Sequence, residues 1–135
     1  MMNRHSINCN NCGFGLPCPT WGFFYVTDDN GNRLALAGEL ESTTIANTIG
    51  ISEDAIVGCV FSPERNGEAI QLMQERVGYN SFFLCLTCLE RCALDQKRDI
   101  LQCPSCGSSD VRTFIQLIDT ACPRCRKGTI RETVP

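Results

Sequence analysis

Two short stretches in the second half of the chain decide the fold: residues 103–107, Cys-Pro-Ser-Cys-Gly, and residues 122–125, Cys-Pro-Arg-Cys. The same Cys-x-x-Cys spacing recurs at residues 9–12 and 85–88, so eight of the eleven cysteines among 135 residues fall into four pairs. One tight turn lets both thiolates of a pair reach a single ion, whereas a disulfide framework spreads its cysteines to close longer loops. The spacing therefore predicts two metal sites of four thiolates each, and the odd cysteine total argues further against disulfides.

The residues beside the pairs suit such turns. Pro104 and Pro123 follow the first cysteine of their pairs, and proline fixes one backbone angle of a turn. Gly13 and Gly107 follow the second cysteine, and glycine readily adopts the positive φ that points backbone N–H groups at the sulfurs. Hydrogen bonds of this kind spread the negative charge of metal-bound thiolates.

This pattern resembles the zinc knuckles of zinc-ribbon proteins, in which two knuckles at the ends of β-hairpins hold one ion. The resemblance covers residues 82–134, with residues 7–15 as an outlying piece. It implies two structural Zn²⁺ ions, each enclosed by four thiolates. Residues 9–14 and 103–107 are also similar to the two knuckles of rubredoxin, which hold one iron, and iron and zinc share this tetrahedral thiolate geometry.

The four pairs can combine in two ways. Fourteen residues separate Cys88 from Cys103, a gap that fits a hairpin and favours joining the second pair to the third. Site one is then Cys85, Cys88, Cys103 and Cys106, and site two is Cys9, Cys12, Cys122 and Cys125. Site two would bring the two ends of the chain together. The alternative joins the third pair to the fourth, across fifteen residues, and the first pair to the second.

Three cysteines and the single histidine remain outside this scheme. Cys59 lies in an apolar segment and is expected to be a small buried hydrophobe. Cys92 follows Cys88 by four residues and is a possible substitute ligand, while Cys18 is expected as a free thiol in a loop. His5 is expected to be a solvated residue near the terminus, although with the three spare cysteines it would complete a third set of four ligands.

The rest of the chain alternates strand and helix signals. Trp21–Thr27 and Arg33–Ala37 predict two strands joined by a turn at Asn30-Gly31. Helix signals follow at Ser42 to Gly50, at Ser52 to Val60 (helical or extended), and from Ser62-Pro63-Glu64 to a stop at Gly78. Further strands are predicted over residues 79–84, 111–118 and 129–134.

These elements predict an α+β fold: a small mixed core with β-hairpins and short helices, plus zinc-ribbon β-hairpins holding two four-cysteine zinc sites. The predicted organisation is an N-terminal zinc knuckle over residues 1–18, the α+β core over residues 19–80, and a zinc ribbon with the C-terminal knuckle over residues 81–135. A core of that size is marginal alone, so the zinc ions would stabilise it, and we expect one cooperative unit.

Composition excludes several classes of protein. The longest apolar stretch, residues 82–89, is too short to span a bilayer, and the first residues lack the apolar region of a secretion signal, which favours a cytoplasmic protein. Four thiolates leave no open coordination position on the metal, and no nucleophile motif or phosphate-binding loop occurs. We therefore expect no catalysis and no small-molecule substrate.

A protein-interaction adaptor with structural zinc is the favoured function, and a nucleic-acid-associated protein of the transcription or translation machinery is the alternative. The net charge is −3, and two four-thiolate zinc sites would lower it to about −7, which disfavours a phosphate backbone. The cations that would contact nucleic acid are Lys97, Arg98, Arg124, Arg126 and Lys127. A rubredoxin-like iron electron carrier and thiol–disulfide exchange are further alternatives.

Overall fold

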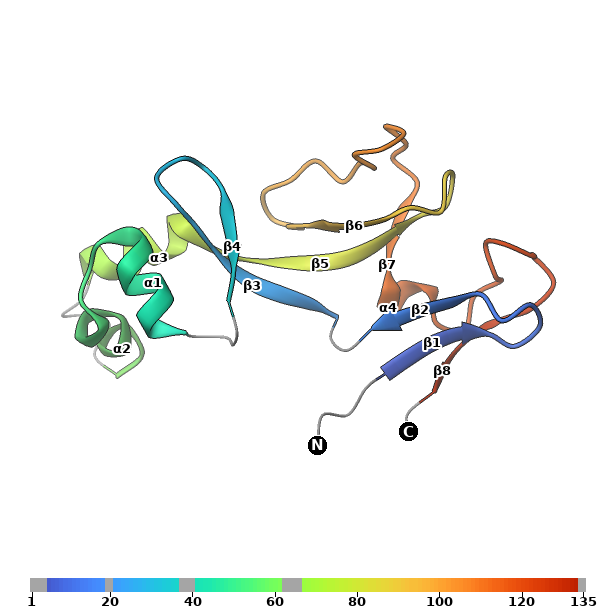
Figure 1. Cartoon of the computed structure of the whole chain (residues 1–135), viewed down its shortest axis with the longest axis horizontal. Coiled ribbons are helices and arrows are strands. Elements are labelled where there is room, and N and C mark those ends of the chain that lie inside the picture. The colour runs from blue at the N-terminus through green and yellow to red at the C-terminus, as the bar shows by residue number, and fades with distance from the viewer. Residues whose placement is uncertain (1–4, 19–20, 37–40, 62–66, 134–135) are drawn as a thin grey trace. The chain divides into compact units, whose positions relative to one another are not determined.

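The computed structural model describes residues 5–18, 21–36, 41–61 and 67–133 (Figure 1). Over these residues the chain forms four α-helices and eight β-strands, and its strands pair antiparallel in two sheets. The mixture of helices and antiparallel sheets agrees with the predicted α+β class. None of the helices in the described part has the length and apolar character needed to cross a membrane. The chain divides into two compact units, residues 23–80 and residues 1–22 with 81–135.

The unit of residues 23–80 begins with a β-hairpin. Its elements are β3 (Gly22–Thr27), β4 (Arg33–Ala35), α1 (Ser42–Ile49), α2 (Glu53–Phe61), α3 (Gly67–Arg76) and the first part of β5 (Val77–Cys85). The predicted turn is confirmed: Asp28 Oδ1 accepts hydrogen bonds from the backbone N–H groups of Asn30 and Asn32, at 2.9 and 2.8 Å. Gly31 has φ 86°, a value that glycine adopts without a steric penalty.

Three short helices follow the hairpin and enclose an apolar core. The predicted helix end at Gly50 is confirmed, because this residue has φ 76° and its N–H donates to the carbonyl of Ala46 at 2.9 Å. The segment from Ser52 is helical rather than extended. Five buried residues of this unit form one apolar cluster: Val26, Leu36, Ile45, Ala46 and Ile56.

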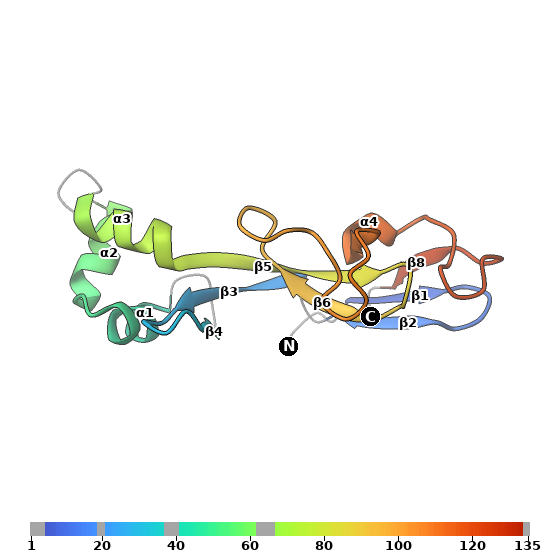
Figure 2. The same ribbon diagram turned by 90° about the horizontal axis from the view of Figure 1, so that it is seen from above.

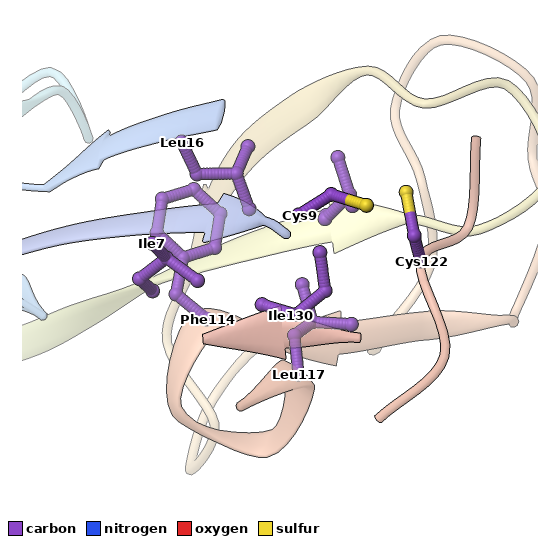
Figure 3. Close-up of a cluster of buried hydrophobic side chains, with 8 residues drawn as sticks. Ile7, Cys9, Leu16, Phe114, Leu117, Cys122 and Ile130 are labelled. Carbon is purple, nitrogen blue, oxygen red and sulfur yellow. The ribbon is translucent and has the colours of Figure 1, made fainter. Parts of the chain in front are cut away.

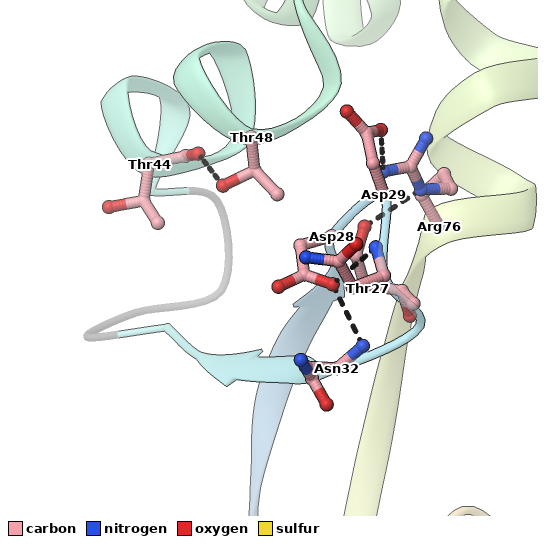
Figure 4. A network of polar contacts seen from close by, with 8 residues as sticks. Thr27, Asp28, Asp29, Asn32, Thr44, Thr48 and Arg76 are labelled. Atoms are coloured by element: carbon pink, nitrogen blue, oxygen red, sulfur yellow. Dashed lines mark hydrogen bonds and ion pairs between the residues drawn. The ribbon is translucent and has the colours of Figure 1, made fainter.

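The third helix differs from its prediction at its end. Its predicted start at Ser62 lies outside the described residues. The predicted stop at Gly78 is wrong, because α3 ends at Arg76 and β5 begins at Val77. Arg76 Nε donates to the carbonyl of Thr27 at 2.7 Å, and its Nη2 contacts Asp29 at 3.0 Å (Figure 4). This side chain ties the end of the helix to the hairpin, and the β-branched Val77 favours a strand.

The other unit contains a three-stranded sheet made from both ends of the chain. β1 (His5–Cys9) lies between β2 (Gly15–Cys18) and β8 (Ile130–Thr133), with both neighbours antiparallel (Figure 2). In this register Ile7 pairs with Leu16 on one side and with Glu132 on the other. The predicted strand over residues 129–134 is thus confirmed within Ile130–Thr133, whereas β1 and β2 were not predicted.

The second half of β5 carries two further strands of this unit. β6 (Arg91–Leu94) and β7 (Val111–Thr113) both pair antiparallel with it. The predicted strand over residues 111–118 is correct only to Thr113, because residues 114–117 form the short helix α4 (Phe114–Leu117). A capping box explains the change: the Thr113 hydroxyl accepts from the N–H of Gln116, and the Gln116 amide oxygen accepts from the N–H of Thr113.

Two apolar clusters fill this unit, and both contain cysteines. The larger cluster joins β1, β2, β5, α4 and β8 (Figure 3), and its buried members are Ile7, Cys9, Leu16, Leu84, Phe114, Leu117, Cys122 and Ile130. The smaller one consists of Phe83, Cys85, Cys103 and Val111. The first cysteine of each pair is thus itself a buried member of an apolar cluster, so the packing of the two clusters fixes its position.

Candidate metal centres

Four cysteines from the two ends of the chain lie together at one end of the three-stranded sheet, where the central strand β1 finishes. Cys9 ends β1 and Cys12 lies in the following turn, while Cys122 and Cys125 occupy the turn that precedes β8. The sulfurs of Cys9 and Cys125 are 3.7 Å apart, as are those of Cys12 and Cys122, and all four lie within 4.8 Å of one another. Four sulfurs placed tetrahedrally about 2.3 Å from one zinc ion would be separated by about 3.8 Å.

A second group of four lies on β5 and the loop that leads to β7. Cys85 ends β5, and the sulfurs of Cys85 and Cys106 are 3.5 Å apart. The sulfurs of Cys88 and Cys103 are 3.7 Å apart, and the four again lie within 4.8 Å of one another. The structure thus groups the cysteines as in the first of the two pairings considered above. Each group could hold one metal ion.

The four turns share one backbone geometry. The residue that follows the second cysteine has a positive φ in every turn: Gly13 76°, Leu89 63°, Gly107 78° and Arg126 61°. In three turns the N–H of this residue donates to the carbonyl of the first cysteine at 2.9 Å. The conformation is the one expected at the two glycines. Leu89 and Arg126 adopt it too, although residues with a side chain rarely do so.

Backbone N–H groups point at the sulfurs of the first centre. Cys9 Sγ accepts from the N–H groups of Asn11 and Cys12, at 3.3 and 3.4 Å. Cys125 Sγ accepts from the N–H of Gly128 at 3.4 Å and from Asn11 Nδ2 at 3.7 Å. These donors stabilise the thiolate form of both sulfurs, as metal ligation requires.

Backbone donors lower the pKa of four of the cysteine thiols. The N–H of Gly128, followed by that of Lys127, lowers the pKa of Cys125 to about 5. The N–H of Cys88 lowers the pKa of Cys85 to about 6, and N–H groups also lower the pKa values of Cys9 and Cys103.

The second cysteines of the first and second turns behave oppositely. The N–H of Phe14 acts to lower the pKa of Cys12, but burial and the neighbouring thiols together raise it to about 11. At Cys88 the N–H of Glu90 is likewise outweighed, and the pKa rises to about 12. Four thiols so close together resist simultaneous ionisation, and a bound cation relieves this repulsion.

Gly128 allows the two ends of the chain to approach. It is buried, and a Cβ added to it would overlap Cys9 Sγ and the Cβ of Asn11. Its carbonyl accepts the N–H of Cys122 at 2.9 Å, so the backbone itself fills this space. Only glycine leaves room here for the first turn to lie against the last.

The remaining cysteines lie outside both groups. Cys59 belongs to α2, where its thiol donates to the carbonyl of Ala55 at 3.2 Å. Cys92 is partly buried beside the smaller apolar cluster, and burial raises its pKa. His5 begins β1 and Cys18 ends β2, and their side chains lie outside the described part of the structure.

The five predicted nucleic-acid contacts are exposed and lie on two loops. Arg124, Arg126 and Lys127 belong to the turn before β8, and Lys97 and Arg98 belong to the loop between β6 and Cys103. Sequence reasoning did not single out Arg112 on β7, which forms an ion pair with Asp110 at 3.1 Å. The only sign of this ion pair in the sequence is that Arg112 follows Asp110 by two residues.

Comparison of the chain with protein-family models, with curated proteins and with solved structures finds no match in any of the three. The functional argument therefore rests on the two four-cysteine groups and the surfaces beside them.

Proposed function

We propose that this chain is a non-catalytic protein-interaction adaptor whose two Zn²⁺ ions are structural. The observation that carries the proposal is the closure of each centre by four cysteine sulfurs within 4.8 Å of one another. Such a sphere has no position for water or substrate, so the metal would fold the unit rather than perform a reaction. Binding would then belong to the surfaces that the metals hold in place.

Charge and exposed apolar side chains favour a protein as the partner. Each filled centre would carry about −2, which would oppose a phosphate backbone close to it. Exposed apolar residues occur on the metal-bearing unit: Ile100 is 83% exposed, Ile115 53% and Leu101 40%. Contacts with such residues release water in the same way as burial in a core.

The first test is the metal content of the purified full-length chain, by native mass spectrometry with elemental analysis. The proposal expects two zinc ions per chain and three cysteines open to alkylation. Iron in place of zinc, with a red colour, would contradict the proposal and favour an electron carrier. One zinc ion or none would contradict the assignment of two closed sites.

Nucleic-acid association is the second candidate, and one observation favours it. α1 and α2 are joined by a three-residue turn that starts with Gly50 at φ 76°, an arrangement typical of helix-turn-helix motifs. The charge of α2 opposes this function, because Glu53 and Asp54 are exposed in its first turn and no cation lies in its last turn. A helix that enters the major groove normally begins beside phosphates, where these carboxylates would be repelled.

A salt titration with a labelled 20-base-pair DNA duplex and a 20-nucleotide RNA separates the two candidates. The adaptor proposal expects binding no tighter than about 10⁻⁴ M at physiological salt. Submicromolar binding that weakens steeply with salt would instead establish nucleic-acid association.

A further inference from the structure

A groove of about 450 Å³ lies in the metal-bearing unit, beside the turns of both centres. Leu86, which follows a ligand of one centre, forms one part of its lining, and Cys122 with Pro123 of the other centre forms another. Leu117 of α4 also lines it, although its side chain is buried. Both metal turns therefore shape the groove, and its accessible apolar surface comes mainly from the half-buried Leu86 and Pro123.

The polar groups of the groove are mainly donors. Arg112 pairs with Asp110 at 3.1 Å and donates to the carbonyl of Val111 at 3.0 Å, but its side chain remains half exposed. Arg126 makes no ion pair with the residues that the structure describes. The oxygen of the Gln116 amide accepts from the N–H of Thr113 at 2.9 Å. This bond orients the amide, and its NH₂ group has no partner among the described residues.

The charges in and around the groove favour an anion with a single negative charge. Two arginines and one aspartate give the groove a local charge of about +1, and filled centres of about −2 each would border it. A polyphosphate would meet both negative centres. A single carboxylate would meet the two guanidinium groups, which form paired hydrogen bonds with carboxylates.

We infer that this groove binds an extended peptide segment of a partner protein that carries one glutamate or aspartate beside a leucine-like residue. Arg126 and Arg112 would take the carboxylate, the NH₂ of Gln116 would take a backbone carbonyl, and the apolar side chain would pack on Leu86 and Pro123. This inference rests on the proposed adaptor function and names the chemistry of its partner.

The test is an NMR titration of the zinc-loaded, ¹⁵N-labelled full-length chain with the end-blocked pentapeptide Ser-Leu-Glu-Leu-Ser, which carries one carboxylate. We expect saturable shifts of the Gln116 side-chain amide and of the Arg126 Nε–H, and no comparable shifts with the end-blocked Ser-Leu-Gln-Leu-Ser. Arg126→Gln should weaken binding at least about tenfold, because it removes a charged hydrogen-bond donor. Arg124→Gln is the matched control: it removes the same charge from the same turn but lies outside the groove, and should change the affinity less than twofold.

Arg112→Gln provides a second variant, and the zinc content of every variant is measured so that loss of metal is not mistaken for loss of binding. Equal binding of the two peptides, no saturable shift, or an unchanged affinity in both groove variants would overturn the inference. If the chain binds two zinc ions and no nucleic acid but the groove residues show no shifts with the peptide, only the groove inference is contradicted and the adaptor function still stands. Tight binding of the RNA probe in the groove would overturn the adaptor function as well.

Discussion

The sulfur of Cys9 lies 3.7 Å from the sulfur of Cys125, although 116 residues separate them along the chain. A metal ion bound there would close nearly the whole sequence into one loop. The other centre closes much shorter loops, because Cys88 and Cys103 are only 15 residues apart. Since the entropy of loop closure grows with loop length, the two centres contribute unequally to stability even though their ligands are the same.

Cys12→Ser should reduce the zinc content from two ions to one, and Cys88→Ser should do the same at the other centre. Cys12→Ser should destabilise the chain further by about 1.8 kcal/mol, the loop-closure difference between 110 and 15 residues. Elemental analysis and urea denaturation measure the two effects. Cys59→Ser is the control and should keep both ions, since Cys59 belongs to neither four-cysteine group and its thiol donates to Ala55 of its own helix.

Gly128→Ala should disrupt the centre that joins the chain ends. The added methyl group would overlap Cys9 Sγ and Asn11, and overpacking of this kind costs about 1–3 kcal/mol. Competition with a chromogenic chelator should show weaker zinc binding at one site of two. Gly67→Ala offers a matched change, because nothing lies within 4 Å of its added Cβ, and it should be neutral or stabilise by up to about 1 kcal/mol. Equal zinc affinity in the two variants would contradict the close approach at Gly128.

The four turns were predictable because their signal is local. A Cys-x-x-Cys pair carries its own ligands and turn residues within about five positions, so no partner is needed to recognise it. The positive φ of Leu89 and Arg126 was not predictable. The turn imposes this conformation through the bond from the residue's N–H to the first cysteine's carbonyl, and neither side chain signals it.

The elements that were missed depend on partners distant in the sequence. The segment His-Ser-Ile-Asn-Cys has one large aliphatic residue, Ile7, and becomes the central strand β1 only because β2 and β8 flank it. The short helix α4 replaced the end of a predicted strand for a different reason. The β-branched residues Val111, Thr113, Ile115 and Ile118 favour a strand, whereas the capping box of Thr113 and Gln116 starts a turn of helix.

Phe114→Ala should be among the most destabilising single changes in the metal-bearing unit. Phe114 is 3% exposed, lies in the larger apolar cluster, and stacks on Phe82 with ring centroids 5.9 Å apart. Truncating a buried phenylalanine costs about 3–5 kcal/mol. Ile115→Ala changes the next residue of the same helix, which is 53% exposed, and should cost no more than about 0.5 kcal/mol. Thermal unfolding of the zinc-loaded chain compares the two, and similar midpoints would contradict the described packing.

Arg76→Gln and Asp29→Asn should show how much stability comes from the hydrogen bond of Arg76 to a backbone carbonyl and how much from its surface ion pair with Asp29. Arg76 donates to the Thr27 carbonyl at 2.7 Å from a side chain that is 23% exposed, so its loss should cost about 1.5–3 kcal/mol. The Asp29 side chain is 87% exposed, and screened pairs of this kind contribute at most about 1 kcal/mol. Amide hydrogen exchange of β3 and α3 measures both effects. A larger effect of Asp29→Asn would show that the ion pair, rather than the carbonyl contact, holds the end of α3.

Metal binding should release between one and three protons from each centre at pH 7.5. One thiol in each, Cys125 with a pKa of about 5 and Cys85 with a pKa of about 6, is already ionised and has no proton to lose. Cys12 and Cys88, with pKa values of about 11 and 12, are protonated and must each lose one. Because binding releases protons, zinc affinity should rise with pH and fall on acidification. The fall should steepen below pH 6 at the centre of Cys85 and below pH 5 at the centre of Cys125, where these thiols also carry protons that zinc must displace. Calorimetry in buffers of different ionisation enthalpy counts the protons, and four per ion would contradict the lowered pKa values of Cys125 and Cys85.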